Sequence, residues 1–172
     1  TIILSSNRVG KPVQLSTRYH RWNSRAGERE ALFPTLRYQP IDDELIWFHR
    51  LLPKVGSVDA ASVLRKIRSN ITIEACRRRN AAHNIYWVRV PGYFCQFFDS
   101  PPMATPENGG APRQRGEVNA IGFDSELTRG LVHAILNSSL YYLFFCSYTD
   151  TRHVNPGDVT GFPLDVSSFA ES

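Results

Sequence analysis

The sequence lacks the short motifs that mark the common enzyme classes. It has no G-x-S-x-G of serine hydrolases, no H-E-x-x-H of zinc proteases, no G-x-x-x-x-G-K-[ST] phosphate loop and no G-x-G-x-x-G dinucleotide loop. It also has no E-x-K, which a nuclease would combine with paired carboxylates such as Asp42 and Asp43. The five histidines stand at no metal-ligand spacing. We therefore expect no catalytic residue, metal or cofactor in this chain.

Cysteine is scarce and long apolar runs are absent. The three cysteines, Cys76, Cys95 and Cys146, form no C-x-x-C pair and are odd in number, which indicates reduced thiols and a cytoplasmic protein. The densest apolar run, Leu140 to Phe145, holds six residues. A membrane-spanning helix needs roughly 18 or more. The sequence therefore predicts no membrane partner.

With 172 residues the chain has the length of one domain. It is 42% hydrophobic and 21% charged, which is typical of a folded globular protein and excludes a wholly disordered one. The first residue is Thr1 rather than Met, and an apolar segment follows at once without a charged leader. We expect residues 1–172 to form a single domain that belongs to a longer chain.

Positive charge is concentrated in the first half of the chain and is almost all arginine. Residues 1–90 contain 16 Lys and Arg against 7 Asp and Glu, whereas residues 91–172 contain 4 against 9, so the balance changes from +9 to −5. Of the 20 basic residues 17 are arginine, and the planar guanidinium group suits phosphates and the guanine edge. The alternative is that these arginines only form a solvated face.

The residue pattern predicts an α+β fold with a twisted mixed or antiparallel β-sheet and packed helices. Period-two alternation indicates a strand over 13–22, and β-rich runs on both sides of Pro91-Gly92 indicate a hairpin. Ser57 and the segment 137–139 are typical of helix caps. The further expected elements are extended segments at 1–4, 32–38 and 117–123, a helix with its apolar stripe from Leu127 to Ile135, and a helix from Leu140 to Tyr148.

Residues 99–116 carry four prolines and three glycines without periodicity, so we expect a flexible surface loop there. Within it, Ser100-Pro101-Pro102-Met103 is close to the [NDS]-P-P-[aromatic] signature of amino-group DNA methyltransferases, in which an aromatic ring stacks on the flipped base. Met103 supplies no such ring, and no glycine-rich cofactor loop precedes it. We therefore interpret the segment as a turn.

Cations alternate with aromatic rings in several places, as expected of a surface that binds phosphates and stacks on bases. The first stretch lies on and just beyond the strand at 13–22, the second is an arginine run before the hairpin, and the third lies on its first strand. In each case the alternative is a structural one: rings in the core, including half of the strand that carries Trp87, and arginines in solvent. The candidate DNA-binding residues are Arg18, Tyr19, His20, Arg21, Trp22, Arg25, Arg77, Arg78, Arg79, Tyr86 and Arg89.

Five segments together resemble one protein family over residues 17–164. The more specific two are L-N-S-[small]-L-[aromatic] at 136–142 and D-x-R-H-[VL]-N at 150–155. With these, the sequence resembles the C-terminal specificity region of adenine-specific DNA methyltransferases, including type IIG restriction-modification enzymes and related phage-defence methylases. The other three segments are Thr17 to Trp22, Glu28-Arg29 with Leu32-Phe33-Pro34, and Pro53 to Ser57, and Phe162-Pro163-Leu164 follows the second motif.

The resemblance implies a target recognition domain: an α+β module that grips double-stranded DNA, reads a short site and presents adenine to a separate catalytic domain. That N-terminal methyltransferase domain of the parent chain would bind S-adenosylmethionine, and a nuclease domain could be fused to it. Arg152 and His153 then become candidate phosphate contacts. Their structural alternative, which we favour, is that Asp150 pairs with Arg152 and His153 locks the helix before it. After Asn155, where relatives often carry a basic residue, this chain has Pro156-Gly157.

Two other classes of function stay open from the sequence. One is an enzyme, a nuclease or transferase, built from the Ser100 loop and the scattered histidines. The other is a protein–protein interaction module that docks on a methylase or nuclease subunit through the aromatic helix around Tyr141 to Phe145.

Overall fold

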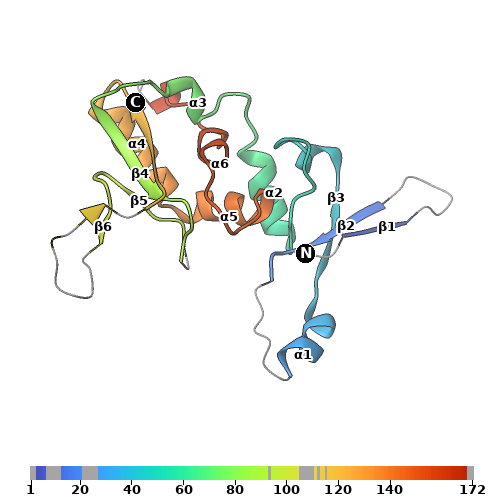
Figure 1. Ribbon diagram of the computed structural model, residues 1–172. Coiled ribbons are helices and arrows are strands. Elements are labelled where there is room, and N and C mark those ends of the chain that lie inside the picture. Colours follow the sequence, from blue (N-terminus) through green and yellow to red (C-terminus); the bar gives the residue numbers. More distant parts are fainter. Residues whose placement is uncertain are drawn as a thin grey trace. The chain divides into compact units, whose positions relative to one another are not determined.

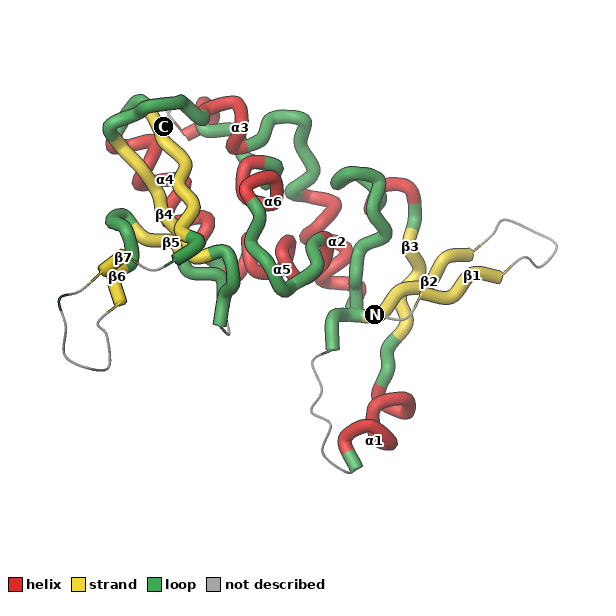
Figure 2. The backbone as a smooth tube through the Cα atoms, viewed as in Figure 1, coloured by secondary structure: helices red, strands yellow, loops and turns green. Residues whose placement is uncertain are grey.

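The computed structural model describes residues 3–6, 13–20, 27–92, 94–104, 111, 113–114 and 116–169. Contacts within the chain divide it into two compact units. Unit 1 is Thr1–Arg68 with Cys146–Tyr148, and unit 2 is Ser69–Phe145 with Thr149–Ser172. Each unit combines helices with a small antiparallel sheet, so the predicted α+β class is confirmed (Figures 1 and 2).

Unit 1 contains a three-stranded antiparallel sheet in the order β1 (Ile3–Ser6), β2 (Val13–Thr17), β3 (Tyr38–Ile41). The strand predicted over 13–22 is present but ends at Thr17. Its last side chains are buried, and the Ser16 hydroxyl donates a 2.7 Å hydrogen bond to the Pro53 carbonyl. Pro40 lacks a backbone N–H and lies on β3, an edge strand, where this loss costs little.

The prediction of an extended segment at 32–38 is wrong. Helix α1 (Glu28–Thr35) covers most of it, with Pro34 inside the last turn. The run Glu28 to Leu32 consists of good helix formers, and a proline near the C-terminal end of a helix interrupts fewer hydrogen bonds than one at its centre. Extended backbone begins only at Leu36, with φ −62° and ψ 130°.

Helix α2 (Val58–Lys66) begins where the sequence predicts. The Ser57 hydroxyl accepts a hydrogen bond from the Ala60 N–H, and Arg65 and Lys66 lie in the last turn. The helix ends at Lys66, so Ile71 lies beyond it and its side chain is exposed. Arg65 ties α2 to the 3-10 turn η1 (Asp43–Leu45), because its guanidinium lies 2.6 Å from Asp42 and 3.5 Å from Glu44.

Unit 2 contains the sheet β5 (Phe97–Phe98), β4 (His83–Val88), β8 (Val118–Phe123), antiparallel throughout. The expected hairpin partner of β4 is therefore only two residues long, and residues 89–96 connect the two strands. Helix α4 (Glu126–Leu136) packs against all three strands of this sheet. Within the predicted loop 99–116, β6 (Met103–Ala104) pairs with β7 (Arg113–Gln114), and residues 105–110, 112 and 115 lie outside the described part.

Among the remaining helices, α5 (Ser139–Tyr148) brings aromatic side chains into the core. The others are α3 (Ile73–Cys76), α6 (Pro156–Thr160) and the 3-10 turn η2 (Ser167–Phe169). The Tyr141 ring meets Phe97 and Phe162 at centroid distances of 5.3 and 5.5 Å. Among the described residues no single helix is long and apolar enough to cross a membrane, and α4 with α5 passes that test only as a pair bent by 62°.

Candidate nucleic-acid interface

The first group of candidate residues follows β2 in unit 1. Arg18 and Tyr19 are exposed, Tyr19 to 38%. His20 is half-buried; its Nε2 atom has no hydrogen-bond partner among the described residues. Burial, and then the charge of Arg18, lower the pKa of His20, so its ring is neutral at physiological pH and contributes no charge. The other three predicted residues, Arg21, Trp22 and Arg25, lie outside the described residues.

Strand register adds two residues that the sequence analysis did not name. Thr17 pairs with Tyr38 at the end of the β2–β3 ladder, so Arg18 and Arg37 are the next residues on the two strands. Arg37 is exposed, and Tyr38 is 36% exposed. We call Arg18, Tyr19, Arg37 and Tyr38 the unit 1 basic surface. Neither arginine forms an ion pair with any residue that the structure describes.

Gly56 fixes the backbone beneath this surface. A Cβ atom on Gly56 would lie 2.5 Å from Cβ of Arg18 and 3.1 Å from its backbone nitrogen, closer than real contacts allow. The segment from Pro53 to Ser57 is therefore structural throughout. Pro53 accepts the Ser16 hydrogen bond, Val55 is buried, and Ser57 caps α2.

The arginine run in unit 2 is mostly neutralised. Arg77 lies 3.1 Å from Glu74, and Arg78 lies 2.8 Å from Asp124. The backbone N–H of Arg78 also donates to the Gly122 carbonyl of β8. Only Arg79 of the three is exposed without an ion pair in the described part of the chain.

Arg89 and Arg152, far apart in sequence, are brought together at the end of β4. The Val154 N–H donates to the Arg89 carbonyl at 2.8 Å, and the indole N–H of Trp87 donates to the Val154 carbonyl at 2.8 Å. Both arginine side chains are exposed and have no ion-pair partner in the described ranges. We call these two residues the Arg89–Arg152 corner.

The segment Asp150 to Asn155 has a structural explanation for nearly every side chain. Asp150 accepts hydrogen bonds from the backbone N–H groups of Arg152 and His153 and lies 3.0 Å from Nδ1 of His153. Partial burial raises the pKa of Asp150, but these hydrogen bonds outweigh it and lower the pKa below its ordinary value. Val154 is buried, and Asn155 forms a capping box with Asp158. Asp150 thus pairs with Arg152 through the backbone N–H of Arg152, and the Arg152 guanidinium forms no ion pair with a described residue.

Strand β4 separates the candidate Tyr86 from its aromatic neighbour in the sequence, Trp87. Trp87 is fully buried, whereas Tyr86 is half-buried and lies on the opposite face of the sheet. Of the two, Tyr86 is the residue that a ligand can reach.

The motif Leu136 to Tyr142 is also structural. The Asn137 side chain accepts from the Phe97 N–H and donates to the Phe97 carbonyl, both at 3.1 Å, and so continues the sheet beyond β5. Ser138 caps α5, as predicted. Within the run Tyr141 to Phe145, through which docking of a partner was predicted, Tyr141, Phe144 and Phe145 are at most 2% exposed, whereas Tyr142 and Leu143 are half-buried. Docking through this helix stays a prediction that could use only the latter two side chains.

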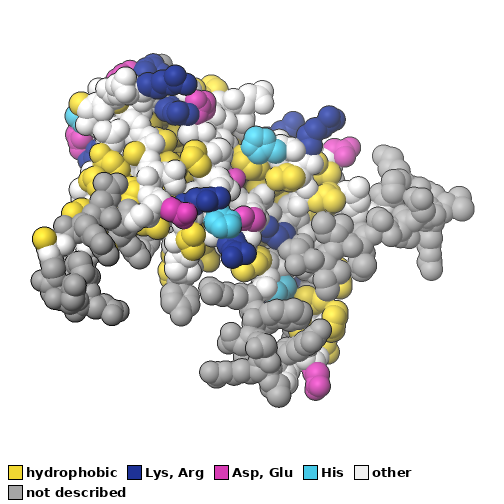
Figure 3. All heavy atoms as spheres, viewed as in Figure 1, with side chains coloured by type: hydrophobic (Ala, Val, Ile, Leu, Met, Phe, Trp, Pro, Cys, Tyr) yellow, Lys and Arg dark blue, Asp and Glu magenta, His cyan; other side chains and the backbone are white. Residues whose placement is uncertain are grey.

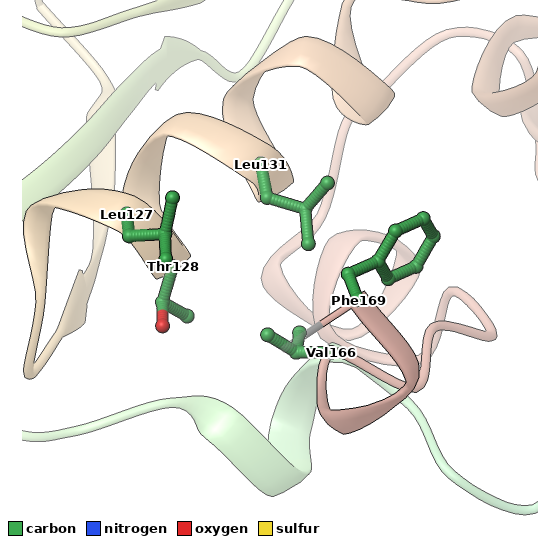
Figure 4. Close-up of a pocket in the computed structure, with 5 residues that line it drawn as sticks. All are labelled: Leu127, Thr128, Leu131, Val166 and Phe169. Atoms are coloured by element: carbon green, nitrogen blue, oxygen red, sulfur yellow. The ribbon is translucent and has the colours of Figure 1, made fainter. Parts of the chain in front are cut away.

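A hollow of about 170 Å³ beside Phe94 and Tyr142, and further hollows in unit 2, border helix α4. The N-terminal turn of α4 borders a polar hollow of about 410 Å³, where Glu126 binds His83 at 3.0 Å and also Arg129. The hydrogen bond from Arg129, and then that from His83, lower the pKa of Glu126. Ser100 lies in the same wall. An apolar hollow of about 150 Å³ lies elsewhere on α4, where Leu131 faces Val166 and Phe169 (Figure 4).

No protein-family model, curated protein or solved structure matches this chain. The resemblance to methyltransferase recognition domains therefore stays a prediction. Among the described residues, no three His, Cys, Asp or Glu side chains are placed to hold a metal ion.

Proposed function

We propose that this chain is a sequence-specific double-stranded DNA recognition domain of an adenine-specific DNA methyltransferase of a restriction-modification or phage-defence system. It holds the duplex and positions the target adenine for a separate domain that binds S-adenosylmethionine. The domain itself supplies no catalytic group.

The observation that carries the proposal is the unit 1 basic surface. Its guanidinium groups have no ion-pair partner in the described structure, and Tyr19 and Tyr38, the residues that follow Arg18 and Arg37 in the chain, are exposed too. A cation that is free of carboxylates can neutralise a phosphate and release a condensed counterion, which is the main source of affinity for DNA. Elsewhere in the chain several arginines are already paired with carboxylates, including Arg65, Arg77 and Arg78.

The Arg89–Arg152 corner supports the same proposal in unit 2. Its arginines come from segments 63 residues apart, and hydrogen bonds of the backbone and of the buried Trp87 hold these segments together. Such rigid backbone support lowers the conformational entropy that phosphate contacts would otherwise cost.

The first experiment measures affinity of the chain for duplex DNA by fluorescence anisotropy over a range of salt concentrations. We expect the double variant Arg18→Ala/Arg37→Ala to weaken binding and to reduce the slope of log K against log salt by about 2, one for each lost phosphate contact. Arg65→Ala is the matched control in unit 1, because its guanidinium is occupied by Asp42 and Glu44. Equal slopes for the wild type and the double variant would refute the proposed surface.

Sequence specificity needs a separate measurement. Selection from a pool of randomised duplexes is expected to enrich one short site that contains adenine. If the pool shows no enrichment while binding persists, the domain holds DNA without reading it.

The apolar hollow of Figure 4 favours one second candidate, a module that docks on a methylase or nuclease subunit. Leu127 and Phe169, two of its wall residues, are 80% and 54% exposed. Salt-insensitive binding of a partner subunit that Leu127→Ser abolishes, with no affinity for DNA, would select this candidate instead.

A further inference from the structure

The outer face of the β5–β4–β8 sheet carries a row of aromatic and small side chains that no sequence motif marks. Tyr86 of β4 pairs with Phe98 on one side and with Ala120 on the other. Paired residues of antiparallel strands point to the same face, so Phe98, Tyr86 and Ala120 form one row across the sheet. Phe98 and Tyr86 are half-buried and Ala120 is exposed.

The inner face of the same sheet is the one that is covered. Ile85 and Trp87 point to it and are fully buried, and α4 packs there, with His133 2.9 Å from the Phe97 carbonyl. Figure 3 shows hydrophobic side chains at the surface in the region of β4 and β5. Neither Tyr86 nor Phe98 makes a contact with another aromatic ring within the described part of the chain. Their rings are therefore not used for aromatic packing.

Charge around the row is complementary to a phosphate backbone. The Arg89–Arg152 corner lies beyond one end of β4, and Arg79 lies next to Arg78, which bridges to Gly122 near the other end. Carboxylates also lie near the row. Glu117 is exposed beside Arg89, and Asp150, which bonds the backbone of Arg152, is exposed as well. Asp124 is paired with Arg78, and Asp99 follows Phe98 in the chain. Arginines without an ion-pair partner among the described residues thus lie beyond both ends of β4.

We infer that this face binds an unpaired nucleotide by stacking a base on Tyr86 and Phe98, while Arg89 and Arg152 contact the adjoining phosphate. Every base has a π-face, and aromatic residues on an open sheet bind single strands in this way. Ala120 leaves room beside the Tyr86 ring for the second face of the base. The inference goes beyond recognition of a paired duplex and does not depend on the unit 1 basic surface.

The unpaired nucleotide could come from a free single strand or from a duplex in which one nucleotide is extruded. Three fluorescent probes distinguish these sources: a short single strand, the fully paired duplex, and that duplex with one bulged adenine. We expect the single strand and the bulged duplex to depend on Tyr86, and the fully paired duplex not to depend on it. Dependence of the bulged duplex alone would identify the extruded nucleotide as the ligand.

The decisive variant is Tyr86→Leu, which keeps an apolar side chain but removes the ring. We expect it to weaken binding of the single strand or bulged duplex by about 5- to 150-fold, the range measured for loss of one stacked base. Tyr86→Phe should bind within about twofold of the wild type, since the ring remains. Phe94→Leu is the matched control: Phe94 is 64% exposed in unit 2, but its ring packs against Tyr142.

Circular dichroism of each variant checks that the fold is kept. The inference is overturned if Tyr86→Leu binds every probe as the wild type does, if Phe94→Leu loses as much affinity, or if the wild type binds only the paired duplex. It survives if the paired duplex fails to bind at all but the single strand binds in a Tyr86-dependent way. In that case the proposed function fails alone.

Discussion

Gly56 packs against Cβ, Cγ and the backbone nitrogen of Arg18, with no space for a side chain. We expect Gly56→Ala to destabilise the protein by about 1–3 kcal/mol, because overpacking forces a shift of neighbouring backbone rather than of a flexible side-chain end. Thermal unfolding followed by circular dichroism measures this, and DNA binding should weaken as Arg18 is displaced.

Gly130 provides the matched control. It lies inside α4, and a Cβ there would meet nothing within 4 Å. Gly130→Ala should therefore stabilise the protein by about 0.5–1 kcal/mol through helix propensity. A loss of stability at Gly130 equal to that at Gly56 would contradict the steric explanation.

Asp150 makes stability depend on pH at the acid end. Its pKa is lower in the folded protein than in the unfolded chain, so its contribution is complete above the unfolded pKa and is lost as pH falls through the folded pKa. We expect Asp150→Ala to cost about 1 kcal/mol at neutral pH through its lost hydrogen bonds. Urea unfolding at several pH values should show the two proteins converging in acid; a constant difference at all pH values would contradict this account.

At the scale of elements, Asn137 links the end of α4 to β5. Asn137→Ala leaves both backbone groups of Phe97 without this partner and should cost about 1–2 kcal/mol. Asn137→Asp keeps an acceptor for the Phe97 N–H but loses the donor to the Phe97 carbonyl, so this variant should also lower the free energy of unfolding measurably. Hydrogen exchange of the Phe97 amide provides the measurement, and unchanged protection in Asn137→Ala would refute the role.

Local signals explain which elements could be predicted from the sequence. Ser57 and Ser138 cap their own helices three residues away, so the pattern alone locates the start of α2 and α5. The segment expected to be extended at 32–38 begins as a helix because the helix formers before Pro34 override the preference of proline for extended backbone. Strand β5 is bonded at Phe97 to Asn137, which is 40 residues away in the chain, and so distant a partner leaves no local signal in the sequence.

The candidate site was predicted only in part, because the sequence shows local signals but not contacts between distant segments. Arg18 and Tyr19 follow a strand whose alternation is visible in the sequence, and the structure leaves them exposed. Arg37 and Tyr38 join them only through the β2–β3 register, and Arg152 meets Arg89 only through Val154. The aromatic run of α5 is apolar on every side, and such a helix is buried rather than displayed.

At the scale of the whole molecule, α5 belongs to both units. Most of the helix is in unit 2, but Cys146–Tyr148 is counted with unit 1. Unfolding of either unit removes contacts of this helix, so we expect one cooperative transition. Differential scanning calorimetry should give equal calorimetric and van't Hoff enthalpies. Two resolved transitions would show that the units unfold independently.

Two tyrosines of α5 test this coupling. Burial raises the pKa of both Tyr141 and Tyr148, but only the Tyr148 hydroxyl has a partner, the Leu45 carbonyl at 2.8 Å; that of Tyr141 has none among the described residues. Tyr148→Phe should destabilise the entire transition by about 1 kcal/mol, whereas Tyr141→Phe should be neutral or slightly stabilising. Equal losses from the two variants would show that the Leu45 bond is unimportant.

The burial of Trp87 has a spectroscopic consequence. Its indole lies in unit 2, bonded to the Val154 carbonyl, while Trp47 lies in unit 1 with its ring 4.9 Å from Tyr148. Each half of the chain thus contains its own intrinsic fluorophore. The third tryptophan, Trp22, belongs to unit 1. With Trp22 and one of the other two replaced by phenylalanine, the remaining emission reports on one unit alone, so whether the two units melt together becomes visible without any attached dye.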